Sequence, residues 1–185
     1  MERLQESLEE QNENWEPGEL ADYIVNIHHQ YVNRALPELK ALCQKLAGLK
    51  GDSHPELIEI TGIVDQVALD LANHMLKEEN ILFPYIKQLV QARHENRRLD
   101  PPPFGSIANP IKSNETEHFE TAKNVQFIYE KTDQYTPPEG TSSDFKILYS
   151  KLEEFERDLK EHIHLENNVL FPKAMELENE IWSTL

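Results

Sequence analysis

The sequence predicts an all-α protein, an up-down-up-down four-helix bundle made of two pseudo-symmetric helical hairpins. Three observations lead to this expectation. Apolar residues recur at alternating intervals of four and three along four long segments, which is the spacing of one buried helix face. Only six glycines occur in 185 residues, so little of the chain is left for strands and their turns. In addition, one phrase occurs twice, 88 residues apart.

The repeated phrase reads His, three residues, Glu, one residue, Asn, Ile or Val, and then Leu-Phe-Pro. Its copies run from His74 to Pro84 and from His162 to Pro172. Histidine and glutamate four residues apart project from the same helix face, so an imidazole nitrogen and a carboxylate oxygen can converge on one point. This geometry can chelate a metal. On a solvated helix surface such a pair is common and inert, so the face that carries it decides between the two interpretations.

Both copies interrupt an apolar stripe that is expected to face the bundle interior. The stripes are Ile60, Val64, Val67, Leu71, His74, Glu78, Ile81 and Tyr85 in the first copy, and Leu148, Leu152, Phe155, Leu159, His162, Glu166 and Val169 in the second. A buried neutral polar group without a hydrogen bond costs roughly 2–7 kcal/mol, and a charge costs more. The histidines and glutamates therefore need partners inside the bundle, and we expect them to hold a shared ligand.

We expect one domain, with an acidic N-terminal lead-in over residues 1–16 and the bundle over residues 17–185. The predicted helices run from Pro17 to about Leu49, from Pro55 to about Arg93, from about Pro110 to residue 131, and from residue 143 to about Glu180. The proline-rich residues 94–110 link the two hairpins, and residues 132–143 form the last loop. Pro84 and Pro172 should distort their helices at the same point, shortly after each glutamate.

Two further histidines are predicted to face inward. The stripe of the first helix is Val25, His29, Val32, Leu36, Leu39, Cys43 and Leu46, and that of the third is Ile111, Glu115, His118, Ala122, Val125 and Tyr129. His29 and His118 are 89 residues apart, which matches the repeated phrase and indicates an internal duplication. Three neighbours are candidates for contacting a ligand from outside: His28, Glu115, which shares the stripe of His118, and Glu117, which is turned away from that stripe and is favoured as a solvated carboxylate.

Six candidate ligands suit two ions, each taking two histidines, with both glutamates shared as bridges. The six are His29, His74, Glu78, His118, His162 and Glu166. Nitrogen and oxygen ligands without thiolate suit iron, manganese or zinc, and we favour iron because open positions in such a shell allow redox and small-gas chemistry. We therefore expect two iron ions, joined by an oxo or hydroxo bridge. The alternative, four buried histidines satisfied by hydrogen bonds alone, leaves their matched positions on four helices unexplained.

Composition narrows the choice of partners and location. The chain has 34 acidic and 18 basic residues, a formal charge of −16, which argues against nucleic acid and anionic membrane surfaces. No stretch approaches the roughly 20 apolar residues of a membrane span, and the first residues lack a signal-peptide core, so we expect a cytoplasmic protein. The single Cys43 lies on an apolar stripe, where we expect a small core residue rather than a redox thiol.

These residues carry a resemblance to a known family. The doubled His-x-x-x-Glu phrase, together with His28-His29 ahead of Leu36-Pro37-Glu38-Leu39, resembles the hemerythrin-like domain of the "repair of iron centres" proteins over roughly residues 20 to 176. The resemblance implies a hemerythrin-like bundle whose di-iron ligands are the same six residues. Full-length members carry an additional N-terminal domain with a cysteine motif, and we expect this chain to lack it, because about 20 largely acidic residues without cysteine precede the bundle.

The resemblance also implies a function. It points to a non-haem di-iron protein of iron–sulfur cluster repair under nitrosative or oxidative stress. Such a protein would bind and reduce nitric oxide, dioxygen or peroxide, as a nitric oxide reductase-like oxidoreductase, or would donate iron. Its partners would be an electron donor or an iron–sulfur client protein. The alternative is a gas- or metal-sensing or storage module without turnover.

Overall fold

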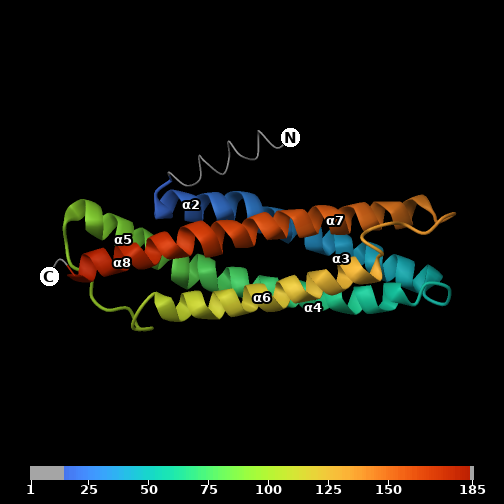
Figure 1. Cartoon of the computed structure of the whole chain (residues 1–185), viewed down its shortest axis with the longest axis horizontal. Helices are drawn as coiled ribbons and strands as arrows, with labels where there is room; N and C mark the ends of the chain where they lie inside the picture. The colour runs from blue at the N-terminus through green and yellow to red at the C-terminus, as the bar shows by residue number, and fades with distance from the viewer. Residues whose placement is uncertain (1–14, 184–185) are drawn as a thin grey trace.

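The computed structural model of the chain describes residues 15–183, and these form four long helical rods with no strand among them (Figure 1). The rods are α2 (Pro17–Ile24), η1 (Val25–His29) and α3 (Gln30–Lys50); α4 (Glu56–Lys77), η2 (Glu78–Leu82) and α5 (Phe83–Glu95); α6 (Ala108–Lys131); and α7 (Ser143–His164), η3 (Leu165–Leu170) and α8 (Phe171–Ser183). The segments η1, η2 and η3 are π-helical. The predicted helix ends agree with these bounds to within a few residues, whereas the predicted lead-in over residues 1–16 lies outside the described residues except for its last two.

Successive rods run antiparallel, which confirms the predicted up-down-up-down bundle (Figure 1). The loops at residues 51–55 and 132–142 lie at one end, and the linker at residues 96–107 lies at the other. Around the bundle, α3 packs against α4 and α7, and α6 packs against α4 and α7. Each rod therefore has two neighbours and one face toward the common centre. Between residues 15 and 183, no helix is long and apolar enough to cross a membrane.

The three π-helical segments shift the buried stripe by one residue. A π turn contains more residues than an α turn, so the inward-facing positions change phase across it. In each case a neighbour is more deeply buried than the residue expected on the stripe: Ile24 in place of Val25, Leu82 in place of Ile81, and Leu170 in place of Val169. The displacement is clearest at Ile81, which is 49% exposed, while Leu82 is 1% exposed. The expectation that Ile81 faces inward is therefore wrong, whereas Val25 and Val169 are partly buried and pack against the apolar core.

Prolines account for two of these segments. Pro84 and Pro172 lie two residues after the ends of η2 and η3, at the second residue of α5 and α8. A proline has no N–H for the carbonyl four residues earlier, and its ring collides with that carbonyl, so a widened turn before it relieves the conflict. The predicted distortion at both prolines is confirmed. Side-chain amides also bond to carbonyls beside the π segments, with Asn26 Nδ2 2.8 Å from the carbonyl oxygen of Asp22.

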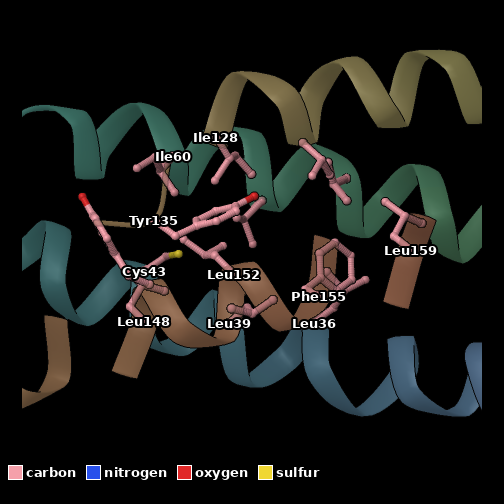
Figure 2. Close-up of a cluster of buried hydrophobic side chains, with 14 of the residues drawn as sticks. Leu36, Leu39, Cys43, Ile60, Ile128, Tyr135, Leu148, Leu152, Phe155 and Leu159 are labelled. Carbon is pink, nitrogen blue, oxygen red and sulfur yellow. The ribbon is translucent and has the colours of Figure 1, made fainter. Parts of the chain in front are cut away.

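Two separate clusters of buried apolar side chains fill the bundle. The α3/α4/α7 core includes Leu36, Leu39, Ile60, Leu152 and Phe155, which Figure 2 shows converging from several helices. The α2/α5/α8 core includes Leu20, Ile24, Ile86, Leu89 and Leu177. Cys43 is fully buried in the first cluster, where burial raises the pKa of its thiol to about 12, as expected of a core residue. Along every rod, one cluster ends and the other begins at the predicted ligands.

A buried carboxylate fixes the linker against the last helix. Glu178 of α8 is 5% exposed, and its oxygens accept hydrogen bonds from Tyr85 Oη at 2.9 Å and Ser106 Oγ at 2.7 Å. The backbone N–H of Ile107 also donates to it, at 3.0 Å. A buried charge is tolerated here because several donors surround it. One side chain therefore joins α5, α8 and the start of α6.

We expect Glu178→Ala to lower the free energy of unfolding by about 3 kcal/mol, because it leaves the buried Tyr85 hydroxyl and the Ile107 N–H without their acceptor. Chemical denaturation followed by circular dichroism measures this change. Glu176→Ala, at an exposed position two residues earlier, is the matched control and should stay within about 0.5 kcal/mol of the unsubstituted protein. Equal stabilities for the two variants would contradict the structural role of Glu178.

Candidate metal centre

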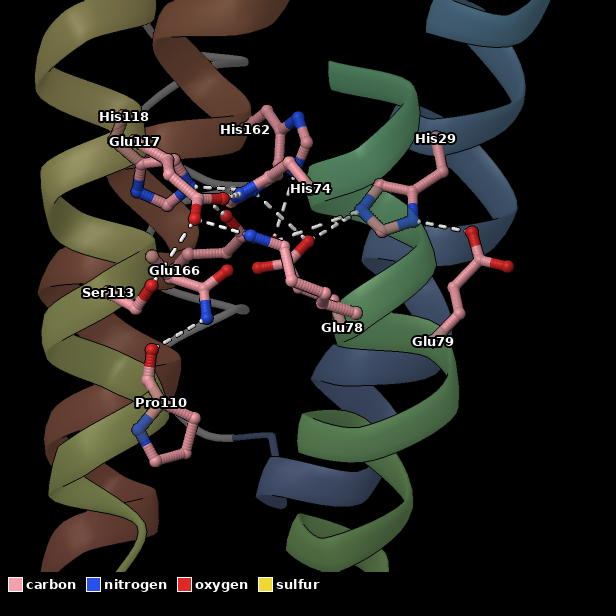
Figure 3. A network of polar contacts seen from close by, with 12 residues as sticks. His29, His74, Glu78, Glu79, Pro110, Ser113, Glu117, His118, His162 and Glu166 are labelled. Atoms are coloured by element: carbon pink, nitrogen blue, oxygen red, sulfur yellow. Dashed lines mark hydrogen bonds and ion pairs between the residues drawn. The ribbon is translucent and has the colours of Figure 1, made fainter. Parts of the chain in front are cut away.

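The six predicted ligands meet in the middle of the bundle, and each is at most 3% exposed (Figure 3). All four rods contribute. His29 ends η1, His74 lies in the last turn of α4, Glu78 begins η2, His118 lies within α6, His162 lies near the end of α7, and Glu166 lies within η3. Three of the six therefore belong to π-helical segments, where the change of phase lets ligands and the next apolar residues all face inward.

The ligand atoms form two groups that could each hold an ion. One group contains His29, Glu78, His162 and Glu166, and the other contains His74, Glu78, His118 and Glu166. Within each group, the ligand atoms lie within 4.8 Å of one another. Both glutamates belong to both groups, which is the arrangement expected of two bridging carboxylates. The structure thus places the six predicted ligands together, two histidines on each side of the glutamate pair.

Each glutamate lies between one histidine of each group. Glu78 Oε2 is 3.3 Å from the Nε2 atoms of both His29 and His74. On the other side, Glu166 Oε1 is 3.0 Å from His162 Nε2, and Glu166 Oε2 is 3.0 Å from His118 Nε2. All four histidines therefore direct the same ring nitrogen, Nε2, toward the carboxylates.

These atoms fit cation binding better than mutual hydrogen bonding. His29 Nε2, both Glu78 oxygens and Glu166 Oε2 are buried, and none has a partner among the described residues in an acceptable hydrogen-bond geometry. Two ligands that are each about 2.1 Å from one cation and about 90° apart lie roughly 3.0 Å from each other. The observed separations of 3.0 and 3.3 Å agree with that figure. Buried lone pairs directed at a common point are costly unless a cation is bound between them.

Three of the four histidines are held from outside through their other ring nitrogen. The Nδ1 atom of His29 is 2.8 Å from Glu79 Oε1, that of His74 is 3.0 Å from Glu117 Oε2, and that of His118 is 2.9 Å from Asn167 Oδ1. An acceptor at Nδ1 places the proton there and leaves Nε2 as a free lone pair, which is the form that binds metal. His162 differs, because its Nδ1 is buried and has no hydrogen-bond partner among residues 15–183.

Of the three residues expected to contact a ligand from outside, the structure places Glu117 and His28 beside ligand histidines and Glu115 in solvent. Glu117 is half-buried, contacts His74 and also pairs with Lys77, so it is not the fully solvated carboxylate that was favoured. His28 is buried and stacks on His162, with ring centroids 5.6 Å apart. Glu115 is exposed, and the expectation that it faces inward is wrong. The inward stripe of α6 instead passes through Asn114, which is buried one turn before His118.

Sequence reasoning missed Glu79, Asn167 and Asp158. Asp158 lies 3.1 Å from His28 Nδ1, and the other two hold His29 and His118. Glu79 and Asn167 occupy the same variable position of the repeated phrase, directly after its glutamate. A polar residue at that position in both copies was the available signal. It was not decisive, because the residue after an inward-facing ligand is normally turned toward solvent.

The central carboxylates and imidazoles lie close enough to change one another's pKa values. Burial disfavours the protonated form of His118 and His29, but the negative charges of the adjacent Glu166 and Glu78 carboxylates outweigh it and raise both pKa values. Burial also opposes ionisation of Glu166, yet His162 and His118 hold the pKa of its carboxyl well below the usual range. Glu166 is therefore ionised at neutral pH and requires positive charge nearby.

A four-helix bundle with a buried cluster of histidines and shared glutamates defines a cation-binding helical protein. Comparison with known families agrees: the model of the hemerythrin HHE cation-binding domain matches residues 20–174, so the chain belongs to that family. It is 34% identical over 176 residues to a probable iron-sulfur cluster repair protein of Haemophilus influenzae, covering 93% of this chain and 73% of that one. It is 36% identical over 168 residues to the iron-sulfur cluster repair protein YtfE of Pectobacterium atrosepticum, covering 87% and 68%.

For protein freed of metal by a chelator, we expect the unfolding temperature to fall as the pH rises above about 6.5. A histidine with a raised pKa stabilises the fold below its unfolded-state pKa, and this contribution is lost as the pH rises through the folded-state value. Ionised Glu166 does not oppose the trend, because its contribution is lost only in strong acid. Thermal unfolding between pH 5 and 9 measures the slope, using a buffer series chosen for about equal ionic strength.

The matched control for this pH series is Glu166→Gln, which removes a charge that raises the pKa of His118. Its unfolding temperature should depend less on pH than that of the unsubstituted protein. Identical slopes for the two proteins would contradict the assigned coupling.

Proposed function

We propose that this chain binds two iron ions at the centre of the bundle and takes part in the repair of iron–sulfur clusters. One observation carries the proposal: two groups of four buried ligands share Glu78 and Glu166, and several of their lone pairs have no hydrogen-bond partner in the part of the chain that the structure describes. The names of its relatives, which are iron-sulfur cluster repair proteins, support the second part.

Different residues of this chain would bind the ions, orient the histidines and exclude water. His29 and His162 would hold one ion, His74 and His118 the other, and the two carboxylates would hold both. Glu79, Glu117 and Asn167 would keep the proton of three neutral histidines on Nδ1, so that Nε2 presents its lone pair to the ion. The apolar cores on either side would keep bulk water away from the centre.

Iron is the favoured metal because of the chemistry of the donor set. Imidazole nitrogens with carboxylate oxygens suit iron, manganese and zinc, and the one cysteine of the chain is buried in the α3/α4/α7 core. Iron in such a shell supplies one-electron redox chemistry and an affinity for nitric oxide, dioxygen or peroxide. In cluster repair the site would act either by reducing such a molecule or by giving up its iron to a client protein.

Protein purified without a chelator or affinity tag should contain about two irons per chain, measured by elemental analysis. His162→Ala should reduce this content to about one, since His162 belongs to one group only. Glu78→Gln and Glu166→Gln should each reduce it to below one, because each glutamate serves both groups. Glu115→Gln, at an exposed position on α6, is the matched control and should retain two. Full iron content in both glutamate variants would refute their assignment as shared ligands.

Two anaerobic assays on the iron-loaded protein distinguish the modes of repair. In the first, the protein is mixed with an apo iron–sulfur protein, sulfide and a thiol reductant, and cluster absorbance is followed. Restoration of the cluster with matching loss of iron from this chain supports iron donation. In the second, nitric oxide is supplied with an electron donor, and consumption beyond two molecules per chain supports reduction. Binding that stops at that stoichiometry, with no cluster restored, would refute the repair function in favour of a sensing or storage module.

A further inference from the structure

The internal duplication allows the outer partners of the ligand histidines to be compared position by position. Glu79 and Asn167 are equivalent, 88 residues apart, and each bonds to Nδ1 of the lone histidine of a hairpin, His29 or His118. At these positions the two halves of the centre are alike. Both supply an oxygen that fixes the ring and its proton.

The other pair of equivalent positions differs between the halves. Glu117 bonds to Nδ1 of His74 at 3.0 Å, and the residue 89 positions earlier is His28. His28 lies beside the equivalent ligand, His162, but the two rings stack nearly parallel, at 14°, and no hydrogen bond joins them. His28 therefore places an imidazole at the position where the internal duplication predicts a carboxylate equivalent to Glu117.

Asp158 holds His28 in this stacked position. Its Oδ1 atom is 3.1 Å from His28 Nδ1, while His28 Nε2 is buried without a partner in the described part of the chain. His162 Nδ1 is likewise buried and without a partner. Two unsatisfied ring nitrogens on adjacent buried histidines are unusual, and neither has an equivalent among the histidines of the other half.

We propose that the two cation positions are inequivalent, and that His28 makes the His29/His162 position the weaker one. This inference rests on the proposed two-ion site. An outer hydrogen bond orients a ligand imidazole and increases its basicity, and loss of such a partner typically lowers metal affinity about 10- to 100-fold. Both histidines of the His74/His118 position have such a partner, whereas only one histidine of the other position has one. The ion at His29/His162 therefore leaves first.

The test begins with ferrous ion alone, loaded anaerobically into the full chain and then released into excess of a coloured ferrous chelator. Two phases of equal amplitude, one ion per chain each, are expected, with rates that differ about tenfold or more. His28→Glu combined with Asp158→Asn places a carboxylate opposite His162 Nδ1 without a repelling neighbour. This double variant should slow the fast phase about tenfold and leave the slow phase unchanged.

Two further variants assign the phases. Glu117→Gln removes the charge at the equivalent position in the other half, so it should accelerate only the slow phase. Asp158→Asn alone controls for the second substitution and should not slow the fast phase. Circular dichroism and thermal unfolding of each metal-free variant separate a change in metal release from a loss of fold.

The outcomes separate this inference from the proposed function. Two bound ions released in a single phase would overturn the inference and leave the two-ion site in place. A fast phase that Glu117→Gln accelerates, or that the double variant leaves unchanged, would overturn the role of His28. A chain that binds no iron would overturn both.

Discussion

The carboxylates of Glu78 and Glu166 lie at the centre of the bundle with no exposed surface, and their charge determines what surrounds them. Moving an ionised carboxylate out of water costs several kcal/mol even after the protein relaxes, so positive charge must approach each oxygen. Four histidine side chains meet that requirement, two beside each carboxylate. Protons can supply the charge in part, but a divalent cation supplies more of it to both carboxylates at once. The rest of the architecture keeps these six side chains together.

The π-helical segments reconcile this polar centre with the apolar packing around it. A regular α-helix has one inward stripe, and each residue added to a turn rotates everything that follows by about 100°. At η2 the extra residue places Glu78 and, beyond it, Leu82 and Phe83 on the inside. Without that adjustment, a helix that faces the centre with its ligands would turn the next core residues toward solvent. The proline after η2 and after η3 favours the widened turn at the required point.

Much of the fold and the six inward-facing histidines and glutamates could be predicted, because both depend on the spacing of residues along the sequence. The alternating spacing of four and three residues predicted that His29, His74, His118 and His162 face the bundle interior. The same rule failed at Ile81 because it assumes a constant number of residues per turn. Other outer contacts were missed for another reason: Glu79 reaches His29 on a different helix, so the contact depends on how two rods pack. Periodicity within one helix carries no such information.

The division of the apolar interior into two cores has a consequence for cooperativity. No single cluster of buried apolar side chains runs the length of the described bundle, and the six central side chains lie between the α3/α4/α7 core and the α2/α5/α8 core. The two ends are coupled through this polar layer and through the continuous backbone of the rods. A protein built in this way can open at one end while the other stays folded, as sub-global units do. The six side chains at the centre then determine whether the four rods behave as one folding unit or as two.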